Sequence, residues 1–308
     1  MVEDQEQVDK LLEVLPDCPV IERVVYDDTR GMRHYDHPTL MSFEALEQRG
    51  DAHDRAHPGF HDESVAAGRD TDVCVMLYTS GTTGKPKGVL YSHRSNVLHA
   101  FMASLPDAKG IHSTDVVLPV VPLFHANCWS LAFSTPMTGA SMVMPGAKLD
   151  GPSIYELMDT YKVTFTAGVP TVWLMLLQHM QQNNLTLPHL KRIVIGGSAS
   201  PRAMTKEFEE KYGVEVIHAW GMTEMSPLGS LCTMKPEYQT LTGDAKLDIQ
   251  MKQGHPPFGV EMKITDDNGK RLPWDGKTFG RLKVRGPAVA RRYFKDDTNI
   301  LDDEGFFD

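Results

Sequence analysis

A regular alternation of short apolar runs with segments of helical spacing constrains the fold of this chain more than any other feature. Runs rich in β-branched and apolar residues lie at 73–78, 116–121, 141–144, 163–166, 193–195 and 214–218. Between them, apolar residues recur at helical spacing at 93–105, 154–161, 171–181 and 201–213. Strands that alternate with helices are typical of a mostly parallel sheet covered by helices. The sequence therefore predicts an α/β fold.

The texture of the sequence changes at both ends of this region. Residues 27–70 are rich in Asp, His, Gly and Arg and show little periodicity, which predicts a solvated excursion. Near the other end, alternating runs at 259–265 and 280–285 flank a turn sequence and indicate the strands of a small β subdomain. The domains that we expect are an α/β core over 1–250 and a small β-rich subdomain over 251–308.

Composition narrows the class of protein. The chain has 308 residues and a net charge of −10, which argues against a nucleic acid or an anionic membrane as partner. Its four cysteines form no Cys-x-x-Cys pair, a usage typical of reducing compartments. The first residues lack the pattern of a secretion signal, and no apolar run approaches the roughly 18 residues of a membrane span. We expect a soluble cytoplasmic protein with no nucleic-acid partner and no transmembrane segment.

The segment directly behind the first strand of the alternating region has the composition of an anion-binding loop. Its donors and glycines are Thr79, Ser80, Gly81, Thr82, Thr83, Gly84, Lys85 and Lys87. Glycines let several backbone N–H groups converge on one anion, while hydroxyls and ammonium groups add donors and charge. The segment is not a Walker A motif, because Pro86 interrupts the required spacing. A solvated linker is the alternative, but the length of the pattern favours a polyphosphate site.

Two later segments place small and aromatic residues at the ends of predicted strands. The sequence Val194-Ile-Gly-Gly-Ser-Ala-Ser-Pro201 has a glycine pair that lets the backbone lie against a flat ring, at the strand end where open α/β sheets bind ligands. The segment from His218 to Ser226 delivers an aromatic ring, a hydroxyl and a carboxylate within five residues. There, Trp220 can stack on a base, Thr223 can donate to a phosphate, and Glu224 can bind Mg²⁺.

Both segments have alternative interpretations. The first nearly matches the Gly-x-Ser-x-Gly nucleophile elbow of hydrolases, but Ser200 stands where the last glycine belongs and no oxyanion motif is evident. The second is compatible with a core tryptophan followed by a turn. Its position behind the anion-binding loop favours the nucleotide interpretation.

Taken together, these motifs resemble those of the acyl-adenylate-forming (AMP-binding) superfamily. The loop, with Tyr78 before it and Tyr91-Ser-His93 behind it, is similar to the superfamily's phosphate loop, and the two later segments follow in the same order. The form of the motifs is most similar to medium- and long-chain fatty acyl-CoA synthetases. The resemblance implies an AMP-forming carboxylate–CoA ligase that uses ATP, Mg²⁺ and CoA. It activates a fatty acid or similar carboxylic acid through an acyl-adenylate, and a homodimer of the parent enzyme is a further expectation.

The resemblance also implies roles for individual residues. Nucleotide-binding residues would be Thr79, Ser80, Gly81, Thr82, Thr83, Gly84, Gly196, Gly197, Ser198, Ala199, His218, Ala219, Trp220, Gly221 and Thr223. Catalytic residues would be Lys85, Lys87, His125, Thr223 and Glu224. Thr79 and Glu224 would hold the metal ion.

The acid-binding side rests on two further segments, 122–129 and 164–173, which resemble substrate-pocket segments of fatty acyl-CoA synthetases. By this resemblance His125 lies near the substrate carboxylate and Trp129 gates an acyl tunnel. The tunnel itself would be lined by Thr166, Ala167, Gly168 and Val169. The alternative for each residue is an ordinary place in the core of a buried strand.

The resemblance covers an internal part of the family's large N-terminal domain and stops before its ribose-binding aspartate and mobile C-terminal lid. We therefore expect a fragment with little or no activity alone, in which Asp308 is not the ribose ligand. Two other functions stay open: a nucleotide-binding fragment without turnover, and an adenylation domain that serves a carrier protein. The apolar stretch 166–169 favours a simple carboxylic acid over an amino acid.

Overall fold

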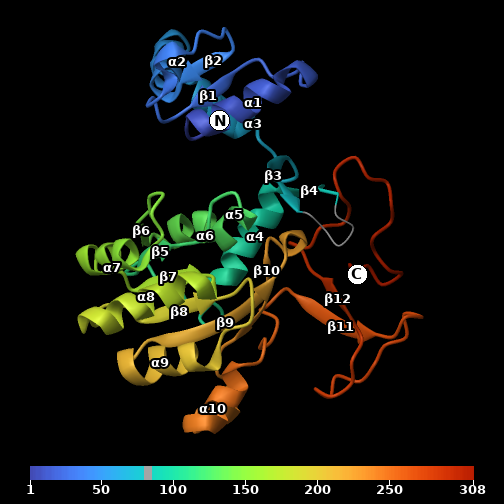
Figure 1. Cartoon of the computed structure of the whole chain (residues 1–308). Coiled ribbons are helices and arrows are strands. Elements are labelled where there is room, and N and C mark those ends of the chain that lie inside the picture. The colour runs from blue at the N-terminus through green and yellow to red at the C-terminus, as the bar shows by residue number, and fades with distance from the viewer. Residues whose placement is uncertain (80–84) are drawn as a thin grey trace. The chain divides into compact units, whose positions relative to one another are not determined.

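The computed structural model describes residues 1–79 and 85–308. The chain forms two compact units, Met1–Arg69 and Asp70–Asp308 (Figure 1). The boundary that the sequence predicts near residue 250 falls inside the second unit, and it stays a prediction.

The first unit is a small assembly of exposed helices and two short strands. Its elements are α1 (Gln5–Val14), β1 (Val24–Tyr26), β2 (Leu40–Ser42), α2 (Phe43–Ala56) and α3 (Phe60–Ala67), with β1 and β2 parallel. The solvated excursion predicted over 27–70 therefore contains two helices that the sequence analysis missed. Neither α2 nor α3 has a buried residue, so no apolar stripe marks them in the sequence.

The second unit confirms the predicted α/β fold. Its first half comprises β3 (Val73–Thr79), β4 (Lys87–Ser92), α4 (His93–Ser104), β5 (Val116–Pro119), α5 (Ala126–Trp129), α6 (Leu131–Thr138), β6 (Ser141–Met142), α7 (Gly151–Thr160) and β7 (Phe165–Gly168). Its second half comprises α8 (Pro170–Asn183), β8 (Arg192–Ile195), α9 (Arg202–Tyr212), β9 (Glu215–Gly221), β10 (Leu228–Cys232), α10 (Gly243–Gln250), β11 (Glu261–Thr265) and β12 (Arg281–Arg285). The central sheet has the order β10-β9-β8-β7-β5-β6, and every neighbouring pair except β10–β9 is parallel.

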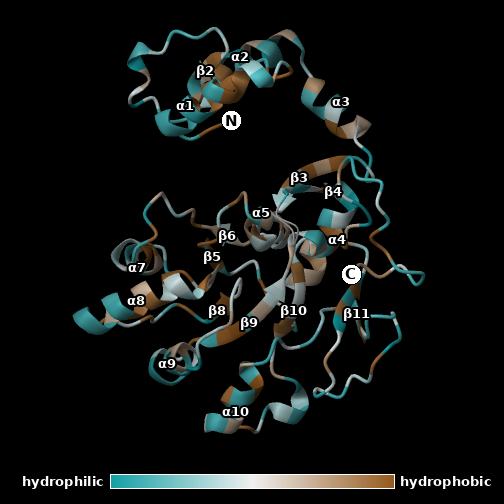
Figure 2. Ribbon diagram, turned by 45° about the vertical axis from the view of Figure 1, so that its right-hand side comes forward, coloured by the Kyte–Doolittle hydropathy of each residue, from teal (hydrophilic) through white to brown (hydrophobic). Residues whose placement is uncertain are grey.

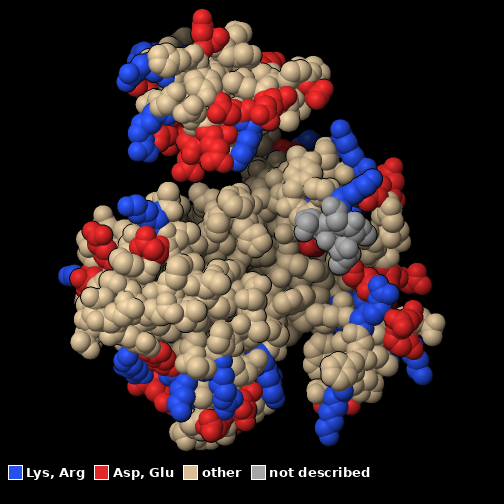
Figure 3. All heavy atoms as spheres, viewed as in Figure 1, with Lys and Arg blue, Asp and Glu red and all other residues tan. Residues whose placement is uncertain are grey.

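Helices cover both faces of this sheet (Figure 1). Leu118, Ile193 and Ile195 pack with residues of α7, α8 and α9 on one face, where Trp173 is fully buried. Their sequence neighbours, such as Val194, pack with residues of α4, α5 and α6 on the other face. Strands buried on both faces read as continuous apolar runs, and Figure 2 shows this hydrophobic character in β9 against the hydrophilic outer end of α8. Charged side chains gather instead over α9 and α10 (Figure 3).

Local signals fix most helix ends, with one correction. Helix α4 begins with a capping box between Ser92 and Ser95, and Gly213 ends α9 at φ +67° as its position predicts. The pair Ser200-Pro201 predicts from the sequence that Ser200 caps α9, and this prediction was wrong. Pro201 occupies the cap position, and the Ser200 hydroxyl instead lies 3.0 Å from that of Thr205.

Two hairpins lie outside the central sheet. Strands β3 and β4 pair antiparallel, with Thr79 opposite Lys87. Strand β4 was not predicted, because the sequence indicates a loop that runs directly from β3 to α4. The expected pair β11–β12 is antiparallel. None of the helices in the described part of the chain combines the length and apolar character needed to cross a bilayer.

Candidate functional site

A cavity of about 280 Å³ lies at the carboxyl ends of β8 and β9. This is the edge at which open α/β sheets bind ligands. Among its lining residues are ten that the sequence analysis selected: Thr79, His125, Trp129, Gly196, Gly197, Ala219, Trp220, Gly221, Thr223 and Glu224. Motifs separated by up to 145 positions, from residue 79 to residue 224, thus converge on one space.

Glycines allow backbone segments to approach closely around the cavity. A Cβ atom on Gly196 would lie 2.9 Å from the Ala219 carbonyl oxygen and 3.2 Å from the Trp129 ring. A Cβ atom on Gly221 would lie 2.1 Å from the Pro227 carbonyl oxygen. Only glycine fits at such separations, so the end of β8 presents bare backbone to the cavity.

Glu224 is buried in the short 3₁₀ turn Thr223–Met225, immediately after β9. The Tyr293 hydroxyl donates to its Oε1 at 2.7 Å, and its own carbonyl oxygen accepts from the Ala290 N–H at 2.7 Å. Burial, followed by the neighbouring Glu224 carboxylate, raises the pKa of Tyr293. Tyr293 therefore remains a neutral donor that fixes the direction of the carboxylate.

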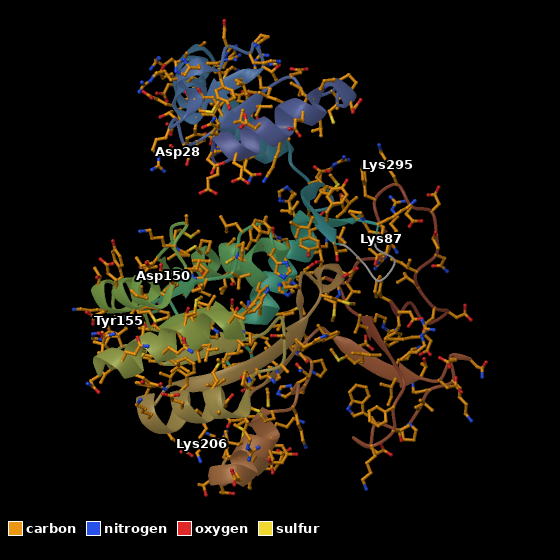
Figure 4. The ribbon with its side chains drawn as sticks, viewed as in Figure 1. Asp28, Lys87, Asp150, Tyr155, Lys206 and Lys295 are labelled. Carbon is orange, nitrogen blue, oxygen red and sulfur yellow. The ribbon has the colours of Figure 1, made fainter. Side chains whose placement is uncertain are left out.

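The hairpin β3–β4 contributes Thr79 to the cavity and Lys87 to its surroundings. The Lys87 ammonium lies 4.6 Å from the centre of the Tyr293 ring, a cation–π contact; Figure 4 labels Lys87 at the start of β4. Lys85 is exposed. The candidate residues Ser80, Gly81, Thr82, Thr83 and Gly84 lie outside the described residues.

Another part of the cavity lining comes from a turn of unusual backbone conformation. All five residues from Ala126 to Ser130 have positive φ, between 46° and 69°. This left-handed conformation costs about 1 kcal/mol or more per residue for side chains other than glycine. The turn is held by the Lys109 Nζ, which donates to the Trp129 carbonyl at 2.5 Å, and by the Cys128 thiol, which donates to the Val121 carbonyl. The result places the Trp129 ring against Gly196.

The remaining candidates lie elsewhere. Thr166, Ala167 and Gly168 are buried in β7, where the Thr166 hydroxyl donates to the Leu118 carbonyl at 2.7 Å. The His218 ring is 2% exposed and accepts from the Ser200 N–H. These four residues, and with them Val169, Ser198 and Ala199, are not among the described residues that line the cavity. Their binding roles stay predictions.

Two residues that shape the cavity received no role from the sequence. Lys109 lines the cavity and is only 3% exposed, yet it belongs to no motif. Its one signal is a single lysine between apolar neighbours and a glycine, Ala108-Lys-Gly-Ile111. Tyr293 is separated from Glu224 by 69 positions, so only the folded chain reveals their contact.

Residues 2–294 match the family of AMP-binding enzymes, and the chain belongs to that family. The chain is 46% identical over 270 residues to a 3-methylmercaptopropionyl-CoA ligase of Ruegeria lacuscaerulensis, which covers 88% of this chain and 48% of that enzyme. It is 47% identical over 238 residues to a medium-chain-fatty-acid–CoA ligase of Ectopseudomonas oleovorans, covering 77% of this chain and 44% of that enzyme. The chain thus spans about half the length of these relatives.

Solved structures have the same fold. The N-terminal domain of FACL13 from Mycobacterium tuberculosis aligns with a TM-score of 0.75 at 21% identity, covering 99% of this chain and 75% of that one. The resemblance drawn from the motifs, and the mostly parallel sheet covered by helices, are therefore confirmed.

Proposed function

We propose that this chain supplies the nucleotide- and acid-binding part of an AMP-forming carboxylate–CoA ligase that activates a medium- or long-chain fatty acid. The observation that carries the proposal is the convergence of Trp220, Glu224 and Trp129 on one cavity. Membership of the AMP-binding family supports it, as do the relatives named as CoA ligases for 3-methylmercaptopropionate and for medium-chain fatty acids.

The reaction has two balanced halves. First, a carboxylate oxygen of the acid bonds to the α-phosphorus of ATP, and the bond from that phosphorus to the pyrophosphate oxygen breaks. Then the CoA thiol releases its proton to solvent, the thiolate sulfur bonds to the acyl carbon, and AMP leaves with the electron pair of the broken C–O bond. Neither half requires a nucleophile from the protein, so the chain contributes position and charge.

Each candidate residue has a part in this scheme. Trp220 stacks on the adenine ring, and the Thr223 hydroxyl donates to a phosphate oxygen. The ammonium groups of Lys85 and Lys87 stabilise the negative charge that develops on the leaving pyrophosphate. On the other side of the cavity, His125 orients the acid's carboxylate and the Trp129 ring closes over the acyl chain.

The residues around Glu224 fit a magnesium ion. Magnesium prefers one or two carboxylates together with phosphate oxygens and water, and Glu224 is a cavity-lining carboxylate held in place by Tyr293. Glu224 and Thr79 would hold the ion, which when bound neutralises charge on the phosphates. We also propose a cytoplasmic location, which the four free cysteines favour. A homodimer of the parent enzyme is a further part of the proposal.

Calorimetric titration tests the proposal on the chain itself. The ligand is a hydrolysis-resistant acyl-adenylate analogue, a fatty acyl group joined to adenosine through a sulfamoyl linker. Its matched control is the same compound without the acyl group. We expect the acyl compound to bind more tightly than the control. Failure of a folded sample to bind either compound would contradict the proposal.

A further inference from the structure

Lys109 is a buried cation without a carboxylate partner in the described structure. It follows α4 and is 3% exposed, and the hydrogen bond of its ammonium goes to the Trp129 carbonyl oxygen. None of the ion pairs between described residues includes it. Lysines are almost never fully buried unless they are paired, so this position requires an explanation.

The groups around the Lys109 ammonium supply no negative charge. Burial, followed by the charge of Lys109, lowers the pKa of His99 to about 3, so this imidazole is neutral. Burial raises the pKa of the Cys128 thiol to about 12, so it stays protonated. Among the described residues that line the cavity with Lys109 are the apolar Val194 and Leu228, and the one carboxylate is that of Glu224, with which Lys109 forms no ion pair in the described structure.

Lys109 itself remains charged at neutral pH. Burial lowers the pKa of its ammonium to about 8, which leaves most molecules protonated at pH values near 7. An unpaired charge in a low-dielectric interior is costly. A negatively charged ligand group that reached this ammonium would remove much of that cost.

The position of Lys109 decides which part of a ligand reaches it. Its hydrogen bond to Trp129 and its electrostatic interactions with Cys128 and His99 lie on the side of the sheet covered by α4, α5 and α6. Glu224, by contrast, lies in the 3₁₀ turn after β9, bonded to Tyr293. The reacting carboxylate belongs beside the nucleotide phosphates, between His125 and Glu224. Because Lys109 bonds to Trp129, the proposed gate of the acyl tunnel, it faces the acyl part of the cavity.

We propose that Lys109 selects acids that carry a second carboxylate, at the end of the acyl chain distal to the reacting one. The preferred substrate class is therefore a medium-chain dicarboxylic acid, a fatty acid whose distal end carries a second carboxylate that pairs with the buried ammonium. This inference rests on the proposed function and narrows the class of acid. It involves only an ion pair, so no bond forms or breaks at Lys109.

Two acyl-sulfamoyl adenosines of equal chain length test this assignment. One carries a hexanoyl group and the other an adipoyl group, which differs by its terminal carboxylate. We expect wild-type protein to bind the adipoyl compound at least about tenfold more tightly, as a buried charge-assisted pair provides. In Lys109→Met, which keeps most of the side-chain volume, the preference should disappear or reverse. The control Lys211→Met removes an exposed lysine of α9 and should behave as wild type.

The outcomes separate the alternatives. A preference of the wild type for the hexanoyl compound, or an equal ratio of affinities in wild type and Lys109→Met, would overturn the assignment. If Lys109 only braces the turn 126–130, the substitution weakens both compounds equally and leaves their ratio unchanged. Should Lys109→Met fail to fold, the wild-type ratio alone decides. Binding of neither compound by the wild type would overturn the proposed function and this inference together, whereas binding of the hexanoyl compound alone overturns only the inference.

Discussion

The two sides of the cavity are built in different ways. The side formed by residues 219–224, which we propose contacts the nucleotide and name the nucleotide wall, is held by hydrogen bonds from two tyrosines. Tyr293 donates to Glu224, and the Tyr91 hydroxyl donates to the Thr223 carbonyl at 2.5 Å. The side formed by residues 125–130, which we propose contacts the acyl chain and name the acyl wall, has a left-handed backbone over residues 126–130. Within the described residues, the buried Asn127 Nδ2 and Ser130 Oγ on this wall have no hydrogen-bond partner.

This difference teaches how one cavity can serve a constant ligand and a variable one. A nucleotide presents the same atoms in every reaction, so a wall held rigid by its own hydrogen bonds can bind it without limiting which acids the protein accepts. An acid-binding wall must match a particular substrate, and strained backbone concentrates at such functional positions. The nucleotide wall should therefore respond to substitution by losing nucleotide affinity, and the acyl wall by changing acid preference.

Removal of the Glu224 carboxylate is the strongest test of the nucleotide wall. We expect Glu224→Ala to lose about 100-fold or more in Mg²⁺-dependent ATP affinity, because even outer-shell partners of a metal contribute 10- to 100-fold. Calorimetry with and without Mg²⁺ measures the effect, and circular dichroism checks the fold. The exposed Glu237→Ala serves as control. Equal ATP affinity of Glu224→Ala and wild type in both conditions would contradict the assignment.

Removal of one hydroxyl tests whether Tyr293 positions that carboxylate. Tyr293→Phe keeps the ring beside Lys87 but leaves Glu224 Oε1 without its donor. We expect roughly tenfold weaker Mg²⁺-dependent ATP binding, with little change in Mg²⁺-independent binding. The control is Tyr155→Phe on α7. A loss that is the same with and without Mg²⁺ would indicate a general packing defect instead.

Truncation of Trp129 tests the acyl wall. The Trp129 ring lies against Gly196, so Trp129→Ala should enlarge the acyl part of the cavity. We expect a shift of about five- to tenfold in relative affinity toward acyl-adenylate analogues with longer chains, since single methylene groups are worth this much in fitted pockets. Trp274→Ala, at a residue that is 63% exposed, is the matched control. An unchanged chain-length profile would return Trp129 to the ordinary core.

A pH titration gives the smallest expected effect. The Lys109 ammonium has its pKa lowered to about 8, so the charged form dominates below that pH and is lost above it. The preference for the adipoyl compound should fall about fourfold between pH 7 and about pH 8.5, because the protonated fraction falls by that factor. His99 and Cys128, the titratable groups that act on Lys109, titrate far from this window. A preference that is constant over this range would contradict a role for the Lys109 charge.

Much of the cavity lining was predictable because its residues follow strands. The pairs Gly196-Gly197 and Thr223-Glu224 come directly after β8 and β9, whose carboxyl ends meet at one edge of the sheet. Lys109 was not predictable, because its importance comes from burial without a charge partner, which spacing does not encode. Tyr293 was missed for another reason: its contacts with Val89 and Glu224 join segments remote in sequence.

The same principle separates the parts of the fold that were predicted from those that were not. Strands buried on both faces carry an apolar signature in the sequence. Helices α2 and α3 contain no buried residue, so they carry no such signature. The hairpin strand β4 adjoins a loop whose glycines and lysines dominate the local sequence pattern. Where tertiary contacts rather than local composition define an element, a single sequence carries little information about it.

The contacts of Tyr293 amount to a mechanical linkage. Its backbone pairs with Val89 of β4, the Phe294 N–H donates to the Gly88 carbonyl at 2.7 Å, and its hydroxyl holds Glu224. A displacement of this short segment therefore moves the hairpin next to the anion-binding loop and turns the Glu224 carboxylate in a single motion. Tension applied along the chain beyond residue 294, or a cut just before Tyr293, would therefore disturb the hairpin β3–β4 and the Glu224 carboxylate together.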